Sequence, residues 1–213
     1  MDCLRADRLG CYGYELNTSP FIDSLAEEAV KFSYAFSATS YTVPSIASMF
    51  TSKYPSSHSV KFHQKSPKIS KDSEILLAEI LKSSGYKTAA FVGALVLRKE
   101  IGLNAGFDIY DDRMTGSETN RPLQLIRIGE ETNEKVFKWF KNESSTPFFL
   151  FLHYFDVHGS YANPAPYDSI FDVNTYGKTP ILLNKVADGK EGGIPNYQLL
   201  KVVKNKDGEI GGK

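Results

Sequence analysis

The chain has 213 residues, and its 25 lysines and arginines balance its 25 aspartates and glutamates, so the formal net charge is zero. This balance excludes the strongly basic surface that nucleic-acid binding requires, and we expect no nucleic-acid partner. With 41% hydrophobic residues, the length fits one domain with a buried core, at roughly 100–200 residues per domain.

Apolar segments of the kind that insert into membranes are missing from the sequence. There is no run of about 18 apolar residues, so we expect no membrane span in this chain. Residues 1–5 are too polar for a signal peptide, and together these features favour a cytoplasmic location. Cys3 and Cys11 have no second Cys or His pair at zinc spacing, and we expect both to be free thiols.

Two helices are expected in the first quarter of the chain. Ser19 as N-cap and Pro20 at the first helical position begin a helix over residues 20–31. Its apolar residues repeat at helical spacing, which predicts a stripe that faces a core. A second helix is expected over residues 44–52, after a run of small polar residues.

A helix, a strand and a further helix are expected in the middle of the chain. Asp72 or Ser73 would cap a helix over residues 73–84, and Gly85 would end it. The expected apolar face of this helix carries Leu76, Leu77, Ile80 and Leu81. Tyr86 to Gly93 reads as a strand, and a helix follows over residues 130–141.

Residues 148–155 (FFLFLHYF) form an unbroken apolar and aromatic run bounded by Pro147 and Asp156. Such a run is typical of a central strand buried on both faces, as parallel sheets have. The alternation of strands and helices predicts an α/β fold, a three-layer sandwich around a mainly parallel central sheet.

The character of the sequence changes after Asp156. Residues 157–213 are rich in Pro and Gly and show little periodicity, with 197–204 as the longest candidate element. We therefore expect one partial domain over residues 1–213, with core strands and helices in 1–156 and a loop-rich excursion in 157–213.

Ligands of open α/β sheets bind outside the carboxyl ends of the strands, so candidate site residues should follow predicted strands. Thr42 falls at the start of the helix expected at 44–52, where the helix dipole and free N–H groups favour a developing alkoxide and bind tetrahedral anions. The alternative is an ordinary threonine N-cap.

Two other positions complete the candidate list, and the remaining histidines are not candidates. His158 follows the strand at 148–155 and is suited to donate to an anionic ester or to protonate a leaving group; the alternative is a hydrogen bond within a turn. Asp2 would stand beside Thr42 if a strand led into it, and the alternative is a frayed terminal residue. His153 reads as a hydrogen-bonded core histidine, and His58 and His63 read as solvated.

Several motifs follow one another in a definite order along the chain. They are Asp2-x-Leu4-Arg5-Ala6-Asp7-x-Leu9-Gly10-Cys11-Tyr12-Gly13, Thr18-Ser19-Pro20-Phe21-Ile22-Asp23-x-Leu25-Ala26, Thr42-x-Pro44-Ser45-x-x-Ser48-x-Phe50-Thr51-Ser52-x-Tyr54-Pro55, Gly85-Tyr86-x-Thr88-Ala89, Gly106-Phe107-Asp108, and Pro147-Phe148-Phe149-Leu150 leading into Asp156-x-His158. Taken together and in this order, these motifs resemble the sulfatase family of the alkaline phosphatase superfamily, and the resemblance covers about residues 2–168.

The resemblance implies a hydrolase of sulfuric esters or related anionic esters, whose substrate is a small molecule, a glycan or a lipid. It implies that Asp2 and Thr42 bind a divalent metal ion and that Thr42 and His158 are catalytic. The ion would be Ca²⁺ in a sulfatase, or Mn²⁺, Mg²⁺ or Zn²⁺ in an enzyme that acts on phosphoesters. The sequence does not indicate an oligomeric state.

Three positions depart from the family pattern. Family sulfatases carry Cys or Ser at the position of Thr42 and oxidise it to formylglycine, and they carry Arg where Ile46 stands and often a second metal aspartate where Cys3 stands. A threonine nucleophile instead resembles the superfamily's phosphodiesterases and its phosphoglycerol and phosphoethanolamine transferases. A third possibility is a family-derived domain that binds without catalysis.

The family pattern also continues beyond the motifs of this chain. A later Asp-His or Asp-Asn metal pair and a further basic residue are not found before Lys213, and no strand leads into Asp2. We therefore expect the chain to be a piece of a longer protein. A calcium ion needs about six to eight oxygen ligands, so we expect the 213-residue chain alone to bind no metal tightly and to be inactive.

Overall fold

A computed structural model describes most of the first 158 residues and short stretches beyond them. The described residues are 1–58, 60–61, 67–70, 72–118, 121–143, 147–158, 166–167, 170, 202–204 and 210–212. They fall into two compact units, each described by itself. The first unit comprises Met1–Asp2, Phe32–Ser117 and Gln124–Phe155, and the second comprises Cys3–Lys31, Glu118–Leu123 and Asp156–Lys213.

A three-stranded sheet in the order β2-β1-β5 lies at the centre of the first unit. β1 (Lys87–Val92) pairs in parallel with β2 (Ile109–Asp111) and with β5 (Phe148–His153). The register runs from Lys87 opposite Phe148 to Val92 opposite His153, so the carboxyl ends of β1 and β5 coincide. This confirms the predicted parallel α/β sheet.

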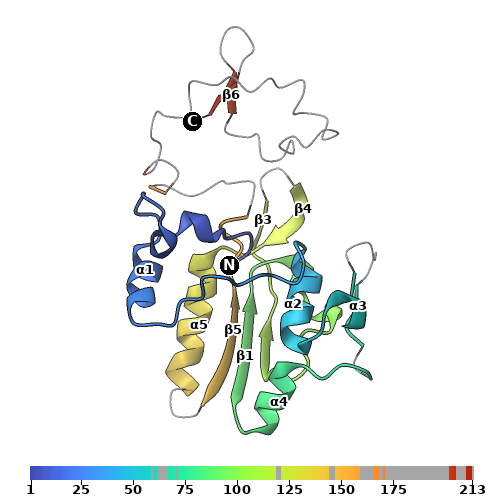
Figure 1. Ribbon diagram of the computed structural model, residues 1–213. Helices are drawn as coiled ribbons and strands as arrows, with labels where there is room; N and C mark the ends of the chain where they lie inside the picture. Colours follow the sequence, from blue (N-terminus) through green and yellow to red (C-terminus); the bar gives the residue numbers. More distant parts are fainter. Residues whose placement is uncertain are drawn as a thin grey trace. The chain divides into compact units, whose positions relative to one another are not determined.

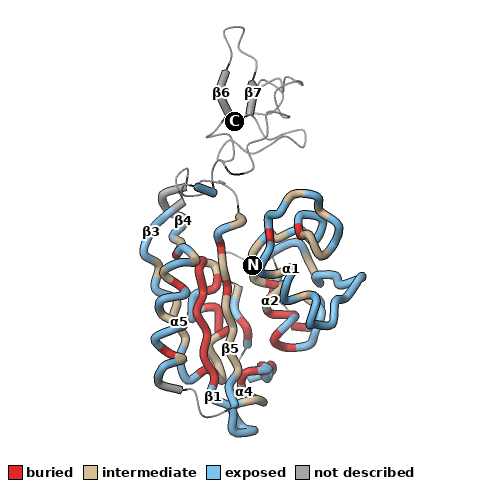
Figure 2. The backbone as a smooth tube through the Cα atoms, turned by 90° about the vertical axis from the view of Figure 1, so that its left-hand side faces the viewer, coloured by how far each residue is buried: buried red, intermediate tan, exposed pale blue. Residues whose placement is uncertain are grey.

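Helices cover both faces of this sheet (Figure 1). α2 (Thr42–Thr51) and α4 (Leu77–Ser83) pack on one face, and α5 (Gly129–Glu143) packs on the other. Successive β1 residues point to opposite faces, as a strand requires: Ala90 contributes to the core under α2, and Phe91 contributes to the core under α5. The three-layer arrangement is therefore confirmed, and Figure 2 shows β1 as its most deeply buried strand.

Aromatic rings fill the interior on both sides of the sheet. Phe50 of α2 packs edge-on against Phe151 of β5, with ring centroids 4.9 Å apart. On the opposite face, Trp139 of α5 packs edge-on against Phe148 at 5.6 Å. Because large rings bury much apolar area, these contacts hold the helices to the sheet.

The other elements are short. They are η1 (Ala6–Arg8), η2 (Gly10–Tyr12), α1 (Pro20–Glu27), α3 (Pro55–His58), η3 (Leu95–Leu97), η4 (Lys99–Ile101), β3 (Gly116–Glu118), β4 (Arg121–Ile126), β6 (Val202–Lys204) and β7 (Ile210–Gly212). β3 pairs with β4, and β6 pairs with β7 in antiparallel fashion. Among the described residues, none of the helices combines the length and the apolar character needed to cross a bilayer.

Two expectations about the sheet and the first helix are wrong. β5 lies at an edge of the described sheet, and β1 is the central strand. An apolar run indicates that both faces of a strand are covered, but it does not indicate whether the strand has a neighbour on each side. α1 has no buried residue, and Phe21 in its expected core stripe is 80% exposed. Amphipathic spacing therefore does not identify a partner surface.

The helix expected at 73–84 begins later, at Leu77. The Glu79 carboxylate accepts a hydrogen bond from the Leu76 N–H at 2.8 Å, so Glu79 caps this helix in place of Asp72 or Ser73. The buried residue of the helix also differs, since Ala78 is buried whereas Leu77 and Ile80 of the expected apolar face are 37% and 52% exposed. Gly85 does end the segment, with a left-handed φ of 88°, as expected.

In the second unit, a carboxylate organises the segment before α1. Asp23 accepts hydrogen bonds from the Cys11 N–H at 2.7 Å and from the Ser19 hydroxyl at 3.0 Å. Burial acts to raise the pKa of Asp23, but these hydrogen bonds outweigh it and lower the pKa. Cys3 and Cys11 are free thiols, as expected. The division between residues 1–156 and 157–213 stays a prediction, because most of the latter lie outside the described residues.

Candidate active site

Asp2 lies at the carboxyl end of the parallel sheet. Its backbone N–H donates to the Tyr154 carbonyl oxygen, directly after β5, at 2.9 Å, and Figure 1 shows the N-terminus beside that end of β5. The Asp2 side chain is only 11% exposed. The alternative of a frayed terminal residue is therefore wrong, because hydrogen bonding and burial hold Asp2 in place.

Thr42 is the first residue of α2, as its predicted place at a helix N-terminus requires. The N-cap is Tyr41, and no side chain caps this helix, so Thr42 is not an ordinary threonine N-cap. Its hydroxyl donates to the Asp2 carboxylate, with distances of 3.2 Å to Oδ2 and 3.4 Å to Oδ1. The structure thus brings together Asp2 and Thr42 at the edge where strands end.

His153 is a third member of this cluster that the sequence interpretation missed. It is the last residue of β5 and is 4% exposed, so its predicted burial is confirmed. Its expected hydrogen bonds are not found, because Nδ1 and Nε2 both lack a hydrogen-bond partner among the described residues. Nε2 instead lies 3.5 Å from Asp2 Oδ2. Its place at the carboxyl end of the apolar run was the signal that could have identified it.

His158 lies in the turn that follows β5 and is half-buried. It belongs to the second unit, so its approach to Thr42 stays a prediction. Its expected place in a loop after the strand is confirmed.

His58 is not solvated, contrary to expectation. It is 3% exposed at the end of α3, where Nδ1 accepts from the Val60 N–H at 3.1 Å and Nε2 lies 2.9 Å from Ser48 Oγ. Since Nδ1 is an acceptor, Nε2 carries the proton and donates to Ser48, so His58 is not placed to act as a base on that hydroxyl. Burial lowers the pKa of His58. His63 lies outside the described residues.

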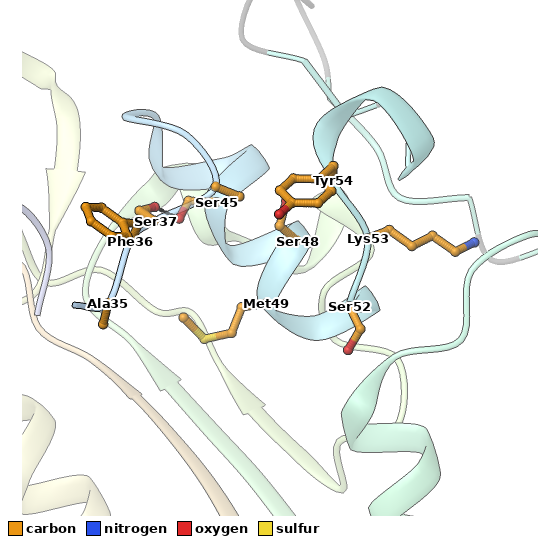
Figure 3. Close-up of a pocket in the computed structure, with 10 residues that line it drawn as sticks. Ala35, Phe36, Ser37, Ser45, Ser48, Met49, Ser52, Lys53 and Tyr54 are labelled. Carbon is orange, nitrogen blue, oxygen red and sulfur yellow. Dashed lines mark hydrogen bonds between the residues drawn. The ribbon is translucent and has the colours of Figure 1, made fainter. Parts of the chain in front are cut away.

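A pocket of about 760 Å³ lies along one side of α2 (Figure 3). Its lining residues are Ala35, Phe36, Ser37, Ala38, Ser45, Ser48, Met49, Ser52, Lys53 and Tyr54. The Ser37 and Ser45 hydroxyls hydrogen-bond to each other, and the Lys53 ammonium lies 2.9 Å from Glu74. In Figure 3 the Lys53 side chain points away from Ser37 and Ser45. Asp2 and Thr42 do not line this pocket, so it is separate from their cluster.

A buried ion-pair cluster stands at the carboxyl end of β2. Asp111 accepts from Arg127 Nη1 at 2.6 Å and from Lys135 Nζ at 2.9 Å, and the Arg127 side chain is fully buried. Burial acts to raise the pKa of Asp111, but hydrogen bonds from Lys135 and Arg127 outweigh it and lower the pKa. One carboxylate thus binds two cationic side chains, and its pairing with Arg127 fixes the loop before α5.

The oxygen atoms of Asp2 and Thr42 are suited to bind a divalent cation. Asp2 supplies a carboxylate and Thr42 supplies a hydroxyl oxygen 3.2 Å from it, which are the donor types that hard cations prefer. Beside them, neither nitrogen of the buried His153 ring has a hydrogen-bond partner among the described residues. Among the described residues, no three His, Cys, Asp or Glu side chains form a metal-binding group.

Ile46 stands where the resemblance expects an arginine. It packs half-buried against the core of the first unit, so this position serves packing and carries no charge toward the site. Cys3 is exposed and has a left-handed φ of 56°.

Comparisons with known proteins point to one family. The sequence model of the family described as Sulfatase matches residues 1–189. A steryl-sulfatase of Mus musculus is 33% identical over an alignment of 96 residues that covers 41% of this chain and 15% of that protein. An ulvan-active sulfatase of Formosa agariphila is 36% identical over 88 residues, which are 41% of this chain and 17% of that protein.

A solved structure shows the same fold. The crystal structure of the phosphonate monoester hydrolase of Agrobacterium radiobacter superposes with a TM-score of 0.60 at 17% identity. The match covers 78% of this chain and 42% of that one. The chain therefore spans less than half the length of each of these proteins.

Proposed function

Because the chain belongs to the sulfatase family, we propose that its full-length protein is a metal-dependent hydrolase of sulfate esters or related anionic esters. The hydrogen bond from Thr42 to Asp2 supports this proposal most directly. It joins a hydroxyl at a helix N-terminus to a carboxylate that is 11% exposed. Such a pair is suited to present an oxygen nucleophile to a tetrahedral anion.

Asp2 and Thr42 would hold the cation, together with ligands from outside the described residues. When bound, a divalent cation lowers the pKa of a coordinated hydroxyl and neutralises charge on the ester oxygens. Asp2 orients the Thr42 hydroxyl. Thr42 Oγ1 gives its proton to the Asp2 carboxylate and forms a bond to sulfur or phosphorus as the bond to the departing alcohol breaks, and protonated His158 gives a proton to the alcohol oxygen. Water then attacks the Thr42 ester and gives one proton to His158, sulfate or phosphate leaves, and the Thr42 oxygen takes its proton back from Asp2.

A second candidate function is that of a threonine-dependent phosphodiesterase, or of a phosphoglycerol or phosphoethanolamine transferase. Thr42 favours it, because formylglycine forms from Cys or Ser and not from Thr. The uncharged Ile46 also differs from the arginine of family sulfatases. In both functions the nucleophile attacks in line with the departing group. They differ in whether sulfur or phosphorus is attacked, and in which molecule accepts the transferred group.

Substrate choice and covalent trapping distinguish these functions. The full-length protein would be assayed with an aryl sulfate and with a bis-aryl phosphate diester, with and without a chelator, and its metal content measured. Mass spectrometry would then search for sulfate or phosphate on Thr42. We expect chelator-sensitive turnover of at least one ester. A protein that contains no metal and converts neither ester would be a non-catalytic binding domain, and the proposal would be wrong.

A further inference from the structure

A buried imidazole with no hydrogen bond is an unusual feature of a folded protein. The His153 side chain is 5% exposed, and neither of its nitrogens has a hydrogen-bond partner among the described residues. Its neighbours on the sheet are apolar: Val92 is its partner in the register, and the Phe151 ring lies 6.5 Å away. Burial of a polar group without a partner is costly, so a histidine that serves packing alone is poorly explained at this position.

The ring stands directly beside the candidate cation site. Nε2 lies 3.5 Å from Asp2 Oδ2, and the same oxygen lies 3.2 Å from the Thr42 hydroxyl. Thr42 and His153 therefore both lie next to the same carboxylate oxygen of Asp2. A shift of roughly 0.5 Å brings the nitrogen to normal hydrogen-bond length from the carboxylate.

We infer that His153 is a positioning residue of the cation site, and that its Nε2–H holds the Asp2 carboxylate in the orientation that binds the ion beside Thr42. A carboxylate that binds a metal is commonly held by a further hydrogen-bond donor, and loss of that donor weakens metal binding. A proton on Nε2 suits this role, because this donor then faces Asp2. This inference rests on the proposed metal-dependent function.

Amide side chains allow a specific test at this position. Glutamine places an N–H donor near the position of Nε2, whereas asparagine is shorter and places its donor near Nδ1. His153→Gln should therefore retain the hydrogen bond to Asp2, and His153→Asn should lose it. A role in packing alone predicts no such difference in metal affinity.

The experiment measures Mn²⁺ affinity of the full-length protein by calorimetry. We expect His153→Gln to bind within about threefold of the wild type, and His153→Asn to bind roughly 10–100-fold more weakly. His58→Asn is the matched control, since it also alters a buried histidine but lies outside the cluster, and its affinity should be unchanged. Thermal unfolding of each metal-free variant shows how far it remains folded.

The outcomes separate this inference from the proposed function. A wild type that binds Mn²⁺, with His153→Asn binding as tightly, overturns the positioning role and leaves the proposed function standing. Equal losses in His153→Asn and His58→Asn also overturn it, because general destabilisation then accounts for the effect. Electron paramagnetic resonance of the Mn²⁺-bound protein tests direct ligation by His153. A strong coupling of Mn²⁺ to a nitrogen nucleus that disappears in His153→Gln would show that His153 binds the ion itself, and would overturn the positioning role. A wild type that binds no divalent cation overturns both proposals.

Discussion

Thr42 and Asp2 are 40 positions apart in the sequence, yet the Thr42 hydroxyl donates to Asp2 Oδ2 at 3.2 Å. Two elements produce this contact: α2 begins at Thr42, and the end of β5 holds Asp2 through the Tyr154 carbonyl oxygen. The carboxyl edge of a parallel sheet and a helix N-terminus thus meet at one point. This is where α/β proteins usually bind anions.

Thr42→Ala should abolish ester cleavage by the full-length protein. The change removes the proposed nucleophile together with an oxygen ligand of the metal, so we expect turnover to fall on the order of 10³–10⁶-fold. Thr42→Ser is the control, since it keeps the hydroxyl, and it should retain measurable turnover. Initial rates with the better of the two ester substrates provide the measurement. Turnover close to wild type in Thr42→Ala would rule out the nucleophile assignment.

His158→Ala should reduce turnover less, by about 10²–10⁴-fold, as for the loss of a general acid or an anion contact. If His158 protonates the departing alcohol, the loss should be large for an alkyl or phenyl ester and small for a nitrophenyl ester. Rates on these esters test the role. An unchanged rate on all of them would remove His158 from the site.

The parallel sheet and most of its helices could be predicted because their signals are local. The helix before Gly85 and the strand after it follow from apolar periodicity and from the left-handed turn that glycine allows. The candidate pair of Asp2 and Thr42 was predicted through the resemblance and the rule for strand ends. Local periodicity alone does not bring together residues 40 positions apart.

Other features depend on tertiary contacts that a local pattern does not contain. His58 lies between Pro55 and a polar loop, which resembles a solvated segment, but Ser48 of α2 and the Val60 N–H satisfy its ring. For His153 the error is the reverse, because hydrogen bonds were expected for its ring and the structure does not show them. Its apolar surroundings suggested a hydrogen-bonded core residue, and the fold supplies no partner among the described residues except the nearby Asp2.

Asp111→Asn should destabilise the protein strongly. It leaves Arg127, whose side chain is fully buried, without its counter-charge, and breaking such a pair costs about 3–5 kcal/mol. Asp7→Asn is a matched control, because the Arg5–Asp7 pair is exposed on both sides and contributes little. Urea denaturation of each variant gives the change in the free energy of unfolding. Similar small changes in both would show that Arg127 finds another partner.

Gly106→Ala should be far more harmful than Gly85→Ala. Both glycines have a left-handed φ, 82° and 88°, so alanine is strained at either position by about 1–2 kcal/mol. At Gly106 an added Cβ would also lie 2.2 Å from the Glu79 backbone nitrogen, whereas at Gly85 it would meet nothing within 4 Å. We therefore expect a larger fall in melting temperature for Gly106→Ala. Equal falls would mean that α4 shifts to make room.

The stability of the protein should decrease in mild acid partly because of His58. Burial lowers the pKa of His58 in the folded protein below the ordinary value of 6.5, so the unfolded chain takes up this proton first as the pH falls. The contribution of neutral His58 is therefore fully present above pH 6.5 and is lost as the pH falls through the folded-state pKa. Protonation of Nδ1 also removes the acceptor for the Val60 N–H, and this hydrogen bond closes the segment after α3.

The test compares the free energy of unfolding of the wild type and of His58→Gln at about pH 8 and about pH 5.5. The wild type should lose more stability than the variant over this interval, because glutamine does not titrate; an equal loss in both proteins would show that other groups account for the acid sensitivity.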